Sequence, residues 1–256
     1  MPSSAAVVKI LRGSGSYVSG EEIAAGLGVS RASVWKRISS LRNMGFDISA
    51  STNKGYKLVS VPDVPSAEVL SSLLNTSLIG QVIEYHPEIA STNDRAMELG
   101  LSGAACGTVV TADRQTAGKA RNGGSWSSPP GKNLYLSIVL RPGVALSRVG
   151  EVADIALESL GLAVSRFFCD TRLLFCKHGL FFGEKKLGGV LCEMRGEIDL
   201  VHYMAVGVGL NVSHCKVDSG TESLFSLTGK MFSRAELTVA VLEEFEHLYL
   251  KWNENE

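Results

Sequence analysis

The spacing of apolar residues at the start of the chain predicts three helices. Residues 5–11, 20–27 and 31–44 carry apolar side chains three or four positions apart, the interval at which side chains share one helix face. Ser19 and Ser30 precede the second and third segments, where a serine hydroxyl can accept from a free backbone N–H of the first turn. The pattern therefore predicts three short helices around a shared core.

Two short segments after the helices alternate apolar and polar residues, as strands do. Residues 46–50 and 55–59 flank the turn 51–54 and predict a hairpin with Lys54 at its tip. A helix-turn-helix followed by a two-stranded wing is a DNA-binding arrangement. The alternative is a three-helix packing or dimerisation module with a solvated basic face.

Beyond residue 62 the pattern predicts one mixed α/β domain. Pro62 and Pro65 mark the joint, because two prolines in four residues end a regular element, and domains 1–62 and 66–256 follow. Helices are expected over 67–74, 91–99, 149–160 and 234–251, and strands over 81–86, 108–113, 134–140, 186–193 and 205–212. The expected fold class is α+β, a winged helix-turn-helix followed by a mixed sheet with helices packed on it.

Charge separates the two expected domains. The first 60 residues hold eight lysines and arginines against three acidic residues, a net +5, whereas the whole chain carries −1. A polyanionic partner such as operator DNA is therefore expected for the N-terminal domain alone. The residues expected to face it are Arg31, Ser33, Lys36, Arg37 and Lys54. Val34 and Trp35 stay open, since each fits either the core or the groove.

Composition argues against several classes of protein. No apolar run approaches the roughly 20 residues that span a bilayer, and the N-terminus lacks a signal-peptide layout, so a cytoplasmic protein without membrane attachment is expected. The five cysteines, Cys215 included, are never spaced as CxxC, and the histidines show no pair at metal-ligand spacing. Neither a disulfide framework nor a metal site is predicted.

A loop rich in glycine and basic residues, 115–133, predicts a mobile cover over a negatively charged ligand. Lys119, Arg121 and Lys132 supply positive charge, and the glycines let backbone N–H groups approach an anion closely. Lys186 begins an apolar strand whose glycines leave room for a bound carboxylate or phosphate. The alternatives are an ordinary basic surface loop and a solvated lysine at a strand end.

Four separated motifs together resemble the biotin protein ligases. They are Ser91-Thr92-Asn93, the loop from Gln115 to Asn133 ending in Leu134-Tyr135-Leu136-Ser137, the run Lys186-Leu187-Gly188-Gly189-Val190-Leu191, and the run Gly207-Val208-Gly209-Leu210-Asn211-Val212. With the winged helix in front, the order from about residue 7 to residue 252 is similar to the bifunctional biotin ligase and biotin repressor family of bacteria. The resemblance implies a class II synthetase-like domain that joins biotin to ATP as biotinyl-AMP. It also implies transfer of biotin to a lysine of a biotin carboxyl carrier protein.

The resemblance also assigns roles to individual residues. Those that would line the ligand pocket are Ser91, Thr92, Asn93, Gln115, Gly118, Lys119, Trp126, Gly188, Gly189 and Asn211. Arg121 and Lys186 would be catalytic, because this chemistry needs positive charge aimed at an oxygen that gains negative charge.

The chain departs from the family pattern where catalysis depends on it. Ala120 and Gly124 replace a glycine and an arginine of the loop, and Phe175-Cys176-Lys177-His178-Gly179 stands where relatives carry lysine-tryptophan-proline-asparagine-aspartate. Losing one oxyanion donor alone costs about 3 kcal/mol of transition-state stabilisation. Ligase activity is therefore expected to be weak or lost, unless Lys177 or His178 reaches the site. Bifunctional relatives continue into a C-terminal β-barrel, which is not expected in a chain that ends at Glu256.

Two functions are compatible with these observations. The first is a DNA-binding transcriptional regulator whose ligase-like domain binds biotin, biotinyl-AMP or a related small anion. Ligand binding would favour dimerisation of the protein through an exposed sheet edge. The second is an active biotin–[acetyl-CoA-carboxylase] ligase that uses ATP and Mg²⁺ and is also a repressor.

Overall fold

The computed structural model describes residues 4–176, 179–214 and 220–254, and the chain divides into two compact units. Residues 1–64 and 68–73 form the first unit, and residues 65–67 and 74–256 form the second. Lys177, His178 and Cys215, which the sequence singled out, lie outside the described residues. The expected α+β class is confirmed, and no helix within the described ranges is long and apolar enough to cross a membrane.

The first unit is a winged helix-turn-helix built from the predicted elements. They are α1 (Ser4–Ser14), α2 (Gly20–Leu27), α3 (Arg31–Asn43), β1 (Asp47–Ser51) and β2 (Gly55–Ser60). Ser19 caps α2 by accepting from the Glu22 N–H, while the Glu22 carboxylate accepts from the Ser19 N–H at 2.8 Å. Ile23 and Ile38 are buried between the helices.

The wing is fastened to the segment between α1 and α2. Val18 and Tyr56 exchange two backbone hydrogen bonds of 2.8 and 2.9 Å. Gly55 has a φ of +98°, and a Cβ there would lie 2.1 Å from the Val18 carbonyl oxygen. Only glycine allows the hairpin to approach the helices this closely.

The second unit contains a seven-stranded sheet in the order β3-β4-β5-β9-β8-β7-β6. The strands are β3 (Ile83–His86), β4 (Val109–Ala112), β5 (Leu134–Leu140), β6 (Leu173–Cys176), β7 (Gly179–Phe182), β8 (Lys185–Gly196) and β9 (Val201–Leu210). The β3–β4 pair is parallel and the other pairs are antiparallel, so the predicted mixed sheet is confirmed. The hairpin of β6 and β7 was not predicted.

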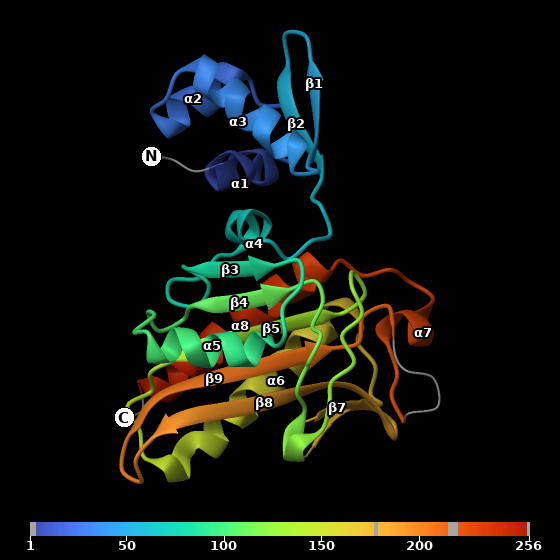
Figure 1. Ribbon diagram of the computed structural model, residues 1–256. Coiled ribbons are helices and arrows are strands. Elements are labelled where there is room, and N and C mark those ends of the chain that lie inside the picture. The colour runs from blue at the N-terminus through green and yellow to red at the C-terminus, as the bar shows by residue number, and fades with distance from the viewer. Residues whose placement is uncertain (1–3, 177–178, 215–219, 255–256) are drawn as a thin grey trace. The chain divides into compact units, whose positions relative to one another are not determined.

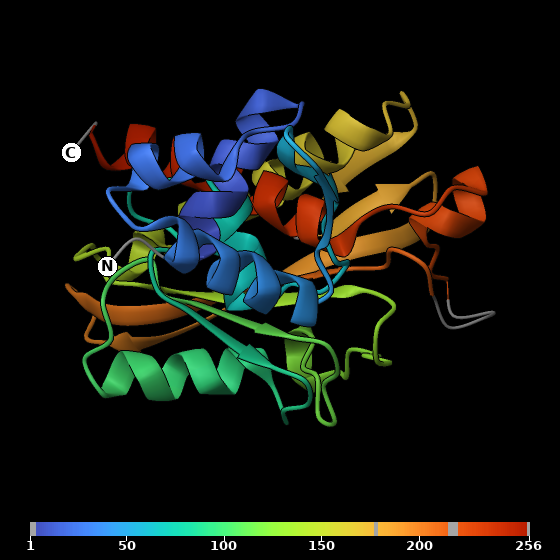
Figure 2. The ribbon, with the colours of Figure 1, turned by 90° about the horizontal axis from the view of Figure 1, so that it is seen from above.

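Helices cover both faces of this sheet. α5 (Thr92–Leu101) packs against β5 and β9 on one face, while α6 (Val149–Phe167) and α8 (Arg234–Asn253) pack together on the other (Figures 1 and 2). Every residue of β5 is buried, which explains why all of its side chains except Ser137 are apolar or aromatic. Two shorter helices are α4 (Ala67–Leu73), which follows the wing, and α7 (Leu224–Thr228).

Glu246 on α8 holds the loop that precedes β3. Its carboxylate accepts backbone N–H groups from Ser77, Leu78 and Ile79, each at 2.7 Å. Burial opposes the charged form of Glu246, but these donors outweigh it and lower the pKa. The charged carboxylate therefore stabilises the second unit.

Glu246→Gln is expected to reduce the free energy of unfolding at pH 7 by about 2 kcal/mol, because hydrogen bonds to a charged acceptor are lost. The folded pKa is lowered, so this contribution is full above the unfolded pKa of about 4.3 and disappears as the pH falls through the folded value. Urea unfolding at pH 7 and pH 3 measures both effects. Glu158→Gln, on the exposed side of α6, is the control. Equal stabilities of the two variants at pH 7 would contradict this role.

Candidate ligand-binding site and DNA-facing surface

A cavity lies where the start of α5, the glycine-rich loop and the strands β5, β8 and β9 meet. Its free interior measures about 50 Å³, which is room for a few water molecules. Residues 115–128 of the loop, called the flap below, cover it. Its lining consists of Ser91, Thr92, Asn93, Gln115, Lys119, Ala120, Arg121, Trp126, Leu136, Ser137, Lys186, Gly189, Val190, Leu191, Gly207, Val208 and Gly209.

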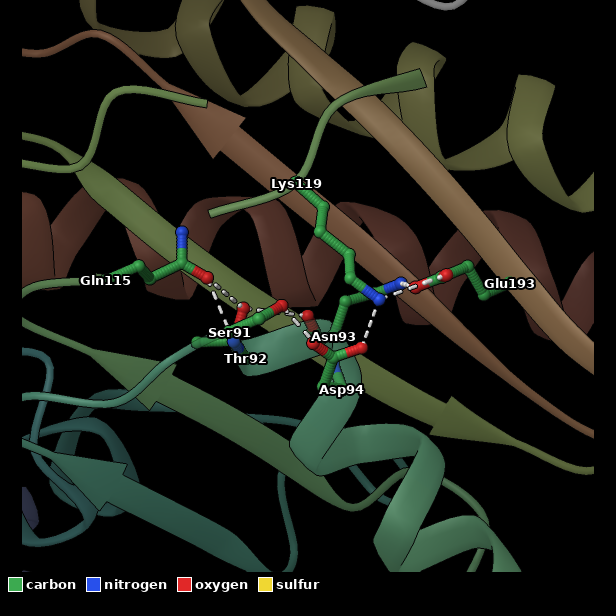
Figure 3. A network of polar contacts seen from close by, with 8 residues as sticks. Ser91, Thr92, Asn93, Asp94, Gln115, Lys119 and Glu193 are labelled. Atoms are coloured by element: carbon green, nitrogen blue, oxygen red, sulfur yellow. Dashed lines mark hydrogen bonds and ion pairs between the residues drawn. The ribbon is translucent and has the colours of Figure 1, made fainter. Parts of the chain in front are cut away.

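Hydrogen bonds fix the polar floor of the cavity. Ser91 caps α5 by accepting from the Asp94 N–H. Thr92 donates from its N–H at 2.9 Å and from its hydroxyl at 3.1 Å to Oε1 of Gln115 (Figure 3). Ser137 of β5 donates to the Thr92 hydroxyl at 2.9 Å. The side-chain orientations of Thr92 and Gln115 are thus set before any ligand binds.

Lys119 ties the flap to the wall of the cavity. Its ammonium is paired with the Asp94 carboxylate and lies 3.5 Å from Oε1 of Glu193 (Figure 3). Asn93 donates to the other Glu193 oxygen at 2.5 Å. The hydrogen bond to Asp94 is the main reason that the pKa of Lys119 is raised. This cation is therefore already neutralised by carboxylates.

Lys186 and Arg121 supply the cavity's remaining positive charge. Both line it, and the Lys186 Nζ lies 5.5 Å from the centroid of the Trp126 ring. Burial lowers the pKa of Lys186, and the nearby Arg121 guanidinium lowers it further. Two cations that repel each other, Lys186 half-buried and Arg121 exposed, favour an anion between them.

Trp126 packs its indole directly onto β9. A Cβ at Gly209 would lie 2.7 Å from Cε2 of the ring, so only glycine leaves room for this contact. The indole Nε1 is buried and has no hydrogen-bond partner among the described residues. An unpaired buried donor beside two cations is suited to an acceptor group of a ligand.

Three residues that the sequence assigned to the ligand do not line the cavity. Asn211 donates to the Glu222 carbonyl at 3.1 Å and accepts from Asn133 at 3.4 Å, so it joins two loops. Gly118 and Gly188 serve close packing, since a Cβ at either would lie within 3 Å of a backbone oxygen. The other assigned residues come together at the cavity.

Sequence reasoning missed several polar residues around the cavity. Ser137 contributes to its floor, while Asp94 and Glu193 hold Lys119. Their partners come from elements up to 100 residues away in the chain. A single serine or carboxylate on a regular element gave no signal for such contacts.

Phe175 and Cys176 belong to β6, the outer strand of the sheet, whereas Lys177 and His178 lie outside the described residues. Leu174 and Phe175 on β6 are 53% and 54% exposed, and the Phe175 ring rests against Gly161 of α6. None of the described residues of β6 lines the cavity. Apolar side chains at this place supply neither a cation nor a carboxylate.

The helix-turn-helix unit presents basic and aromatic side chains on one side of α3. Arg31 and Lys36 are exposed, as is Lys54 on the wing turn, while Ser33 and Arg37 are half-buried. One Arg37 Nη is buried without a hydrogen-bond partner in the described chain, so Arg37 faces outward less than expected. Val34 belongs to the core, and Trp35 is 59% exposed, which resolves the alternative that the sequence left open.

A hollow lies between the first turns of α3 and the wing. Trp35 forms part of its wall together with Arg31 and Ala32, opposite the wing turn 51–53. In DNA-binding units of this kind the recognition helix binds in the major groove, and the position of α3 and the wing on either side of the hollow is compatible with that arrangement. Trp35 thereby joins the residues of the candidate DNA surface.

A winged helix-turn-helix joined to a ligase-like unit with a covered cationic cavity defines the class of the protein. Residues 4–57 match the model of an HTH domain, and residues 85–211 match the biotin/lipoate A/B protein ligase family. The chain is 32% identical over 239 residues to the bifunctional ligase/repressor BirA of Bacillus subtilis, covering 91% of this chain and 74% of that protein. It is also 32% identical to the Escherichia coli bifunctional ligase/repressor, covering 81% and 63% of the two chains.

Solved structures agree with these matches. The biotin protein ligase from Aquifex aeolicus in complex with biotin and ATP superposes with a TM-score of 0.58 and 26% identity, over 68% of this chain and 72% of that one. The chain therefore belongs to the family of bifunctional, DNA-binding biotin ligase/repressors.

Proposed function

We propose that this family member acts chiefly as a ligand-responsive DNA-binding regulator with weak or no ligase activity. The observation that carries the proposal is a cationic ligand cavity in a chain whose described β6 residues, Leu173–Cys176, include no charged side chain. Arg121, Lys186 and Trp126 converge on the cavity, whereas β6 supplies only apolar and thiol side chains. Binding a ligand needs only the cavity residues. Fast acyl and phosphoryl transfer also needs charged groups, which β6 does not carry.

The cavity residues fit biotin and an adenylate in chemical character. Biotin's polar ring matches the prearranged Thr92 and Gln115 pair, and an acyl phosphate matches Arg121 and Lys186. When bound, ATP would supply the adenylyl group that activates the acyl carboxylate, with pyrophosphate as the leaving group. The small free volume means that the flap must move to admit such a ligand. A related small acyl or nucleotide anion would satisfy the same groups.

Incubation with labelled biotin, ATP, Mg²⁺ and a biotin carboxyl carrier domain tests the proposed loss of activity. Little or no label on the carrier is expected, while calorimetry with biotin still shows binding. Rapid labelling would instead establish an active ligase that is also a repressor. Absence of both label and binding heat would rule out biotin as the ligand.

Ligand-dependent dimerisation is the second part of the proposal. Beyond Gly189, β8 pairs only with β9 among the described strands, which leaves a free sheet edge. Near its end the Ile198 carbonyl accepts from the Leu146 N–H at 3.0 Å, and the two residues are 78% and 39% exposed, so two apolar residues lie at the surface close to this edge. We assign a second copy of the chain to this edge, because a dimer places two winged helices on a two-fold operator.

Ile198→Glu is expected to keep the protein monomeric in the presence of biotin and ATP, because a charge would be buried in the interface. Sedimentation velocity with and without ligand measures the change. Leu101→Glu, at the end of α5 and 74% exposed, is the matched control and should still dimerise. A dimer of the Ile198 variant would contradict the assignment of this edge.

The DNA surface yields a prediction about salt. Lys36→Ala is expected to weaken binding to duplexes selected by the protein from a random pool, and to flatten the dependence of log affinity on log salt by about 0.9, as for one lost phosphate contact. Lys9→Ala, on the exposed side of α1, removes the same charge away from α3 and the wing. An unchanged slope for Lys36→Ala would remove this residue from the interface.

We place this activity in the cytoplasm, where biotin, ATP and bacterial DNA meet.

A further inference from the structure

We propose that Ser128 is a positioning residue that couples the ligand cavity to the flap. The proposal rests on ligand binding at the cavity, as argued above. Ser128 does not line the cavity, so it acts through its two neighbours, Gln115 and Trp126.

The flap is an irregular hairpin with Ser128 at its base. The Gln115 N–H donates to the Ser128 carbonyl at 3.3 Å, and the Trp126 N–H donates to the Gly118 carbonyl at 2.8 Å. Nearer the tip, the Ala120 N–H donates to the Gly124 carbonyl at 2.8 Å. The two arms therefore move as a pair, and the base decides where the tip lies.

The Ser128 side chain links the two arms a second time. Its hydroxyl accepts from Nε2 of Gln115 at 2.9 Å and donates to the Trp126 carbonyl at 3.1 Å. Ser128 is 8% exposed, so water does not readily replace these bonds. A Cβ at Gly118 would lie 2.7 Å from the Ser128 oxygen, which shows how tightly this connection is enclosed.

The connection forms one chain of hydrogen bonds from the cavity floor to the flap. It runs from Ser137 through Thr92 and Gln115 to Ser128 and ends at the Trp126 backbone. A ligand that hydrogen-bonds to Thr92 or to the Gln115 amide must change the hydrogen bond that Nε2 of Gln115 donates to the Ser128 hydroxyl. The position of the Trp126 indole over the cavity then depends on ligand at the floor, which is a coupling between two parts of one site.

Trp126 itself provides the probe for this coupling. The chain has three tryptophans, so Trp35→Phe together with Trp252→Phe leaves Trp126 as the sole indole. In that background Ser128→Ala removes the hydroxyl, and Ser128→Thr keeps it. Ser127→Ala, at an exposed neighbouring position, is the control.

The first measurement needs no ligand. Acrylamide quenching of Trp126 is expected to rise in Ser128→Ala toward that of an exposed indole, and to stay at the parent level in Ser128→Thr and Ser127→Ala. Equal quenching in Ser128→Ala and the parent would overturn the proposal whether or not biotin binds.

The second measurement titrates biotin while recording both Trp126 emission and heat. Ser128→Ala is expected to bind biotin roughly tenfold more weakly, as for the loss of one or two hydrogen bonds, and to lose most of the emission change that the parent shows. Parent-like affinity and emission change in Ser128→Ala would contradict the coupling. No heat from the parent would count against the proposed function, and the quenching measurement would still decide the role of Ser128.

Discussion

Lys186→Met is expected to weaken the binding of a non-hydrolysable biotinyl-adenylate analogue by about 10- to 100-fold, the range for loss of a hydrogen bond to a charged group. Methionine keeps an apolar stem of similar length but removes the half-buried ammonium that lies 5.5 Å from the centroid of the Trp126 ring. Lys185→Met is the matched control, because Lys185 points to Glu222 at 3.0 Å and its side chain is 61% exposed. Calorimetry of the two variants measures the difference.

The same substitution has a pH signature. Burial and the Arg121 charge lower the pKa of Lys186, so its ammonium loses its proton at a lower pH than an ordinary lysine with a pKa of about 10.4. Affinity for the anionic analogue should therefore fall as the pH rises through the lowered pKa. The Lys186→Met variant should lack that fall. Parallel pH profiles of the two proteins would contradict the assignment of Lys186 to the anion.

Gly209→Ala is the substitution with the next largest expected effect. Its added methyl would lie 2.7–2.9 Å from three atoms of the Trp126 indole, all on a rigid ring. Overpacking of this kind costs about 1–3 kcal/mol, so the indole should leave β9 and ligand affinity should fall by roughly 5- to 150-fold. A red shift of Trp126 emission in the background that lacks the other two tryptophans would report the displacement.

Two controls separate this effect from general damage to the sheet. Gly150→Ala on α6 adds a methyl that meets nothing within 4 Å and should leave emission and affinity unchanged. In a Trp126→Ala background, Gly209→Ala should have little further effect on affinity, because the clash is gone. Additive losses in that double variant would show that the methyl disturbs β9 by another route.

The local parts of the fold could be predicted from the sequence because their signals are local. Serine caps placed α2 and α3, and a mainly apolar run placed β5 at residues 134–140. Helix α6 runs seven residues past its expected end at residue 160, since Ala163 and Val164 remain buried beneath the sheet. Burial by distant elements carries no signal in a short window of sequence.

The unpredicted elements share a physical reason. β6 and β7 are four residues each, and β6 is the edge strand of the sheet, where Leu174 and Phe175 are exposed and no alternation is required. The family resemblance predicted most of the residues that line the cavity. It could not show that the Lys119 ammonium is paired with Asp94 and Glu193. It also could not show that Asn211 hydrogen-bonds to the Glu222 carbonyl and to Asn133. Those outcomes depend on carboxylates and carbonyls that are distant in the chain.

Calorimetric titration of the intact protein with the biotinyl-adenylate analogue tests most directly whether two cations and the flap tryptophan enclose one anionic ligand. Binding of one ligand per chain is expected, with affinity strongly reduced in both Arg121→Ala and Lys186→Met and retained in Lys185→Met. Absence of binding heat, or equal affinities in all four proteins, would contradict the assignment of this cavity.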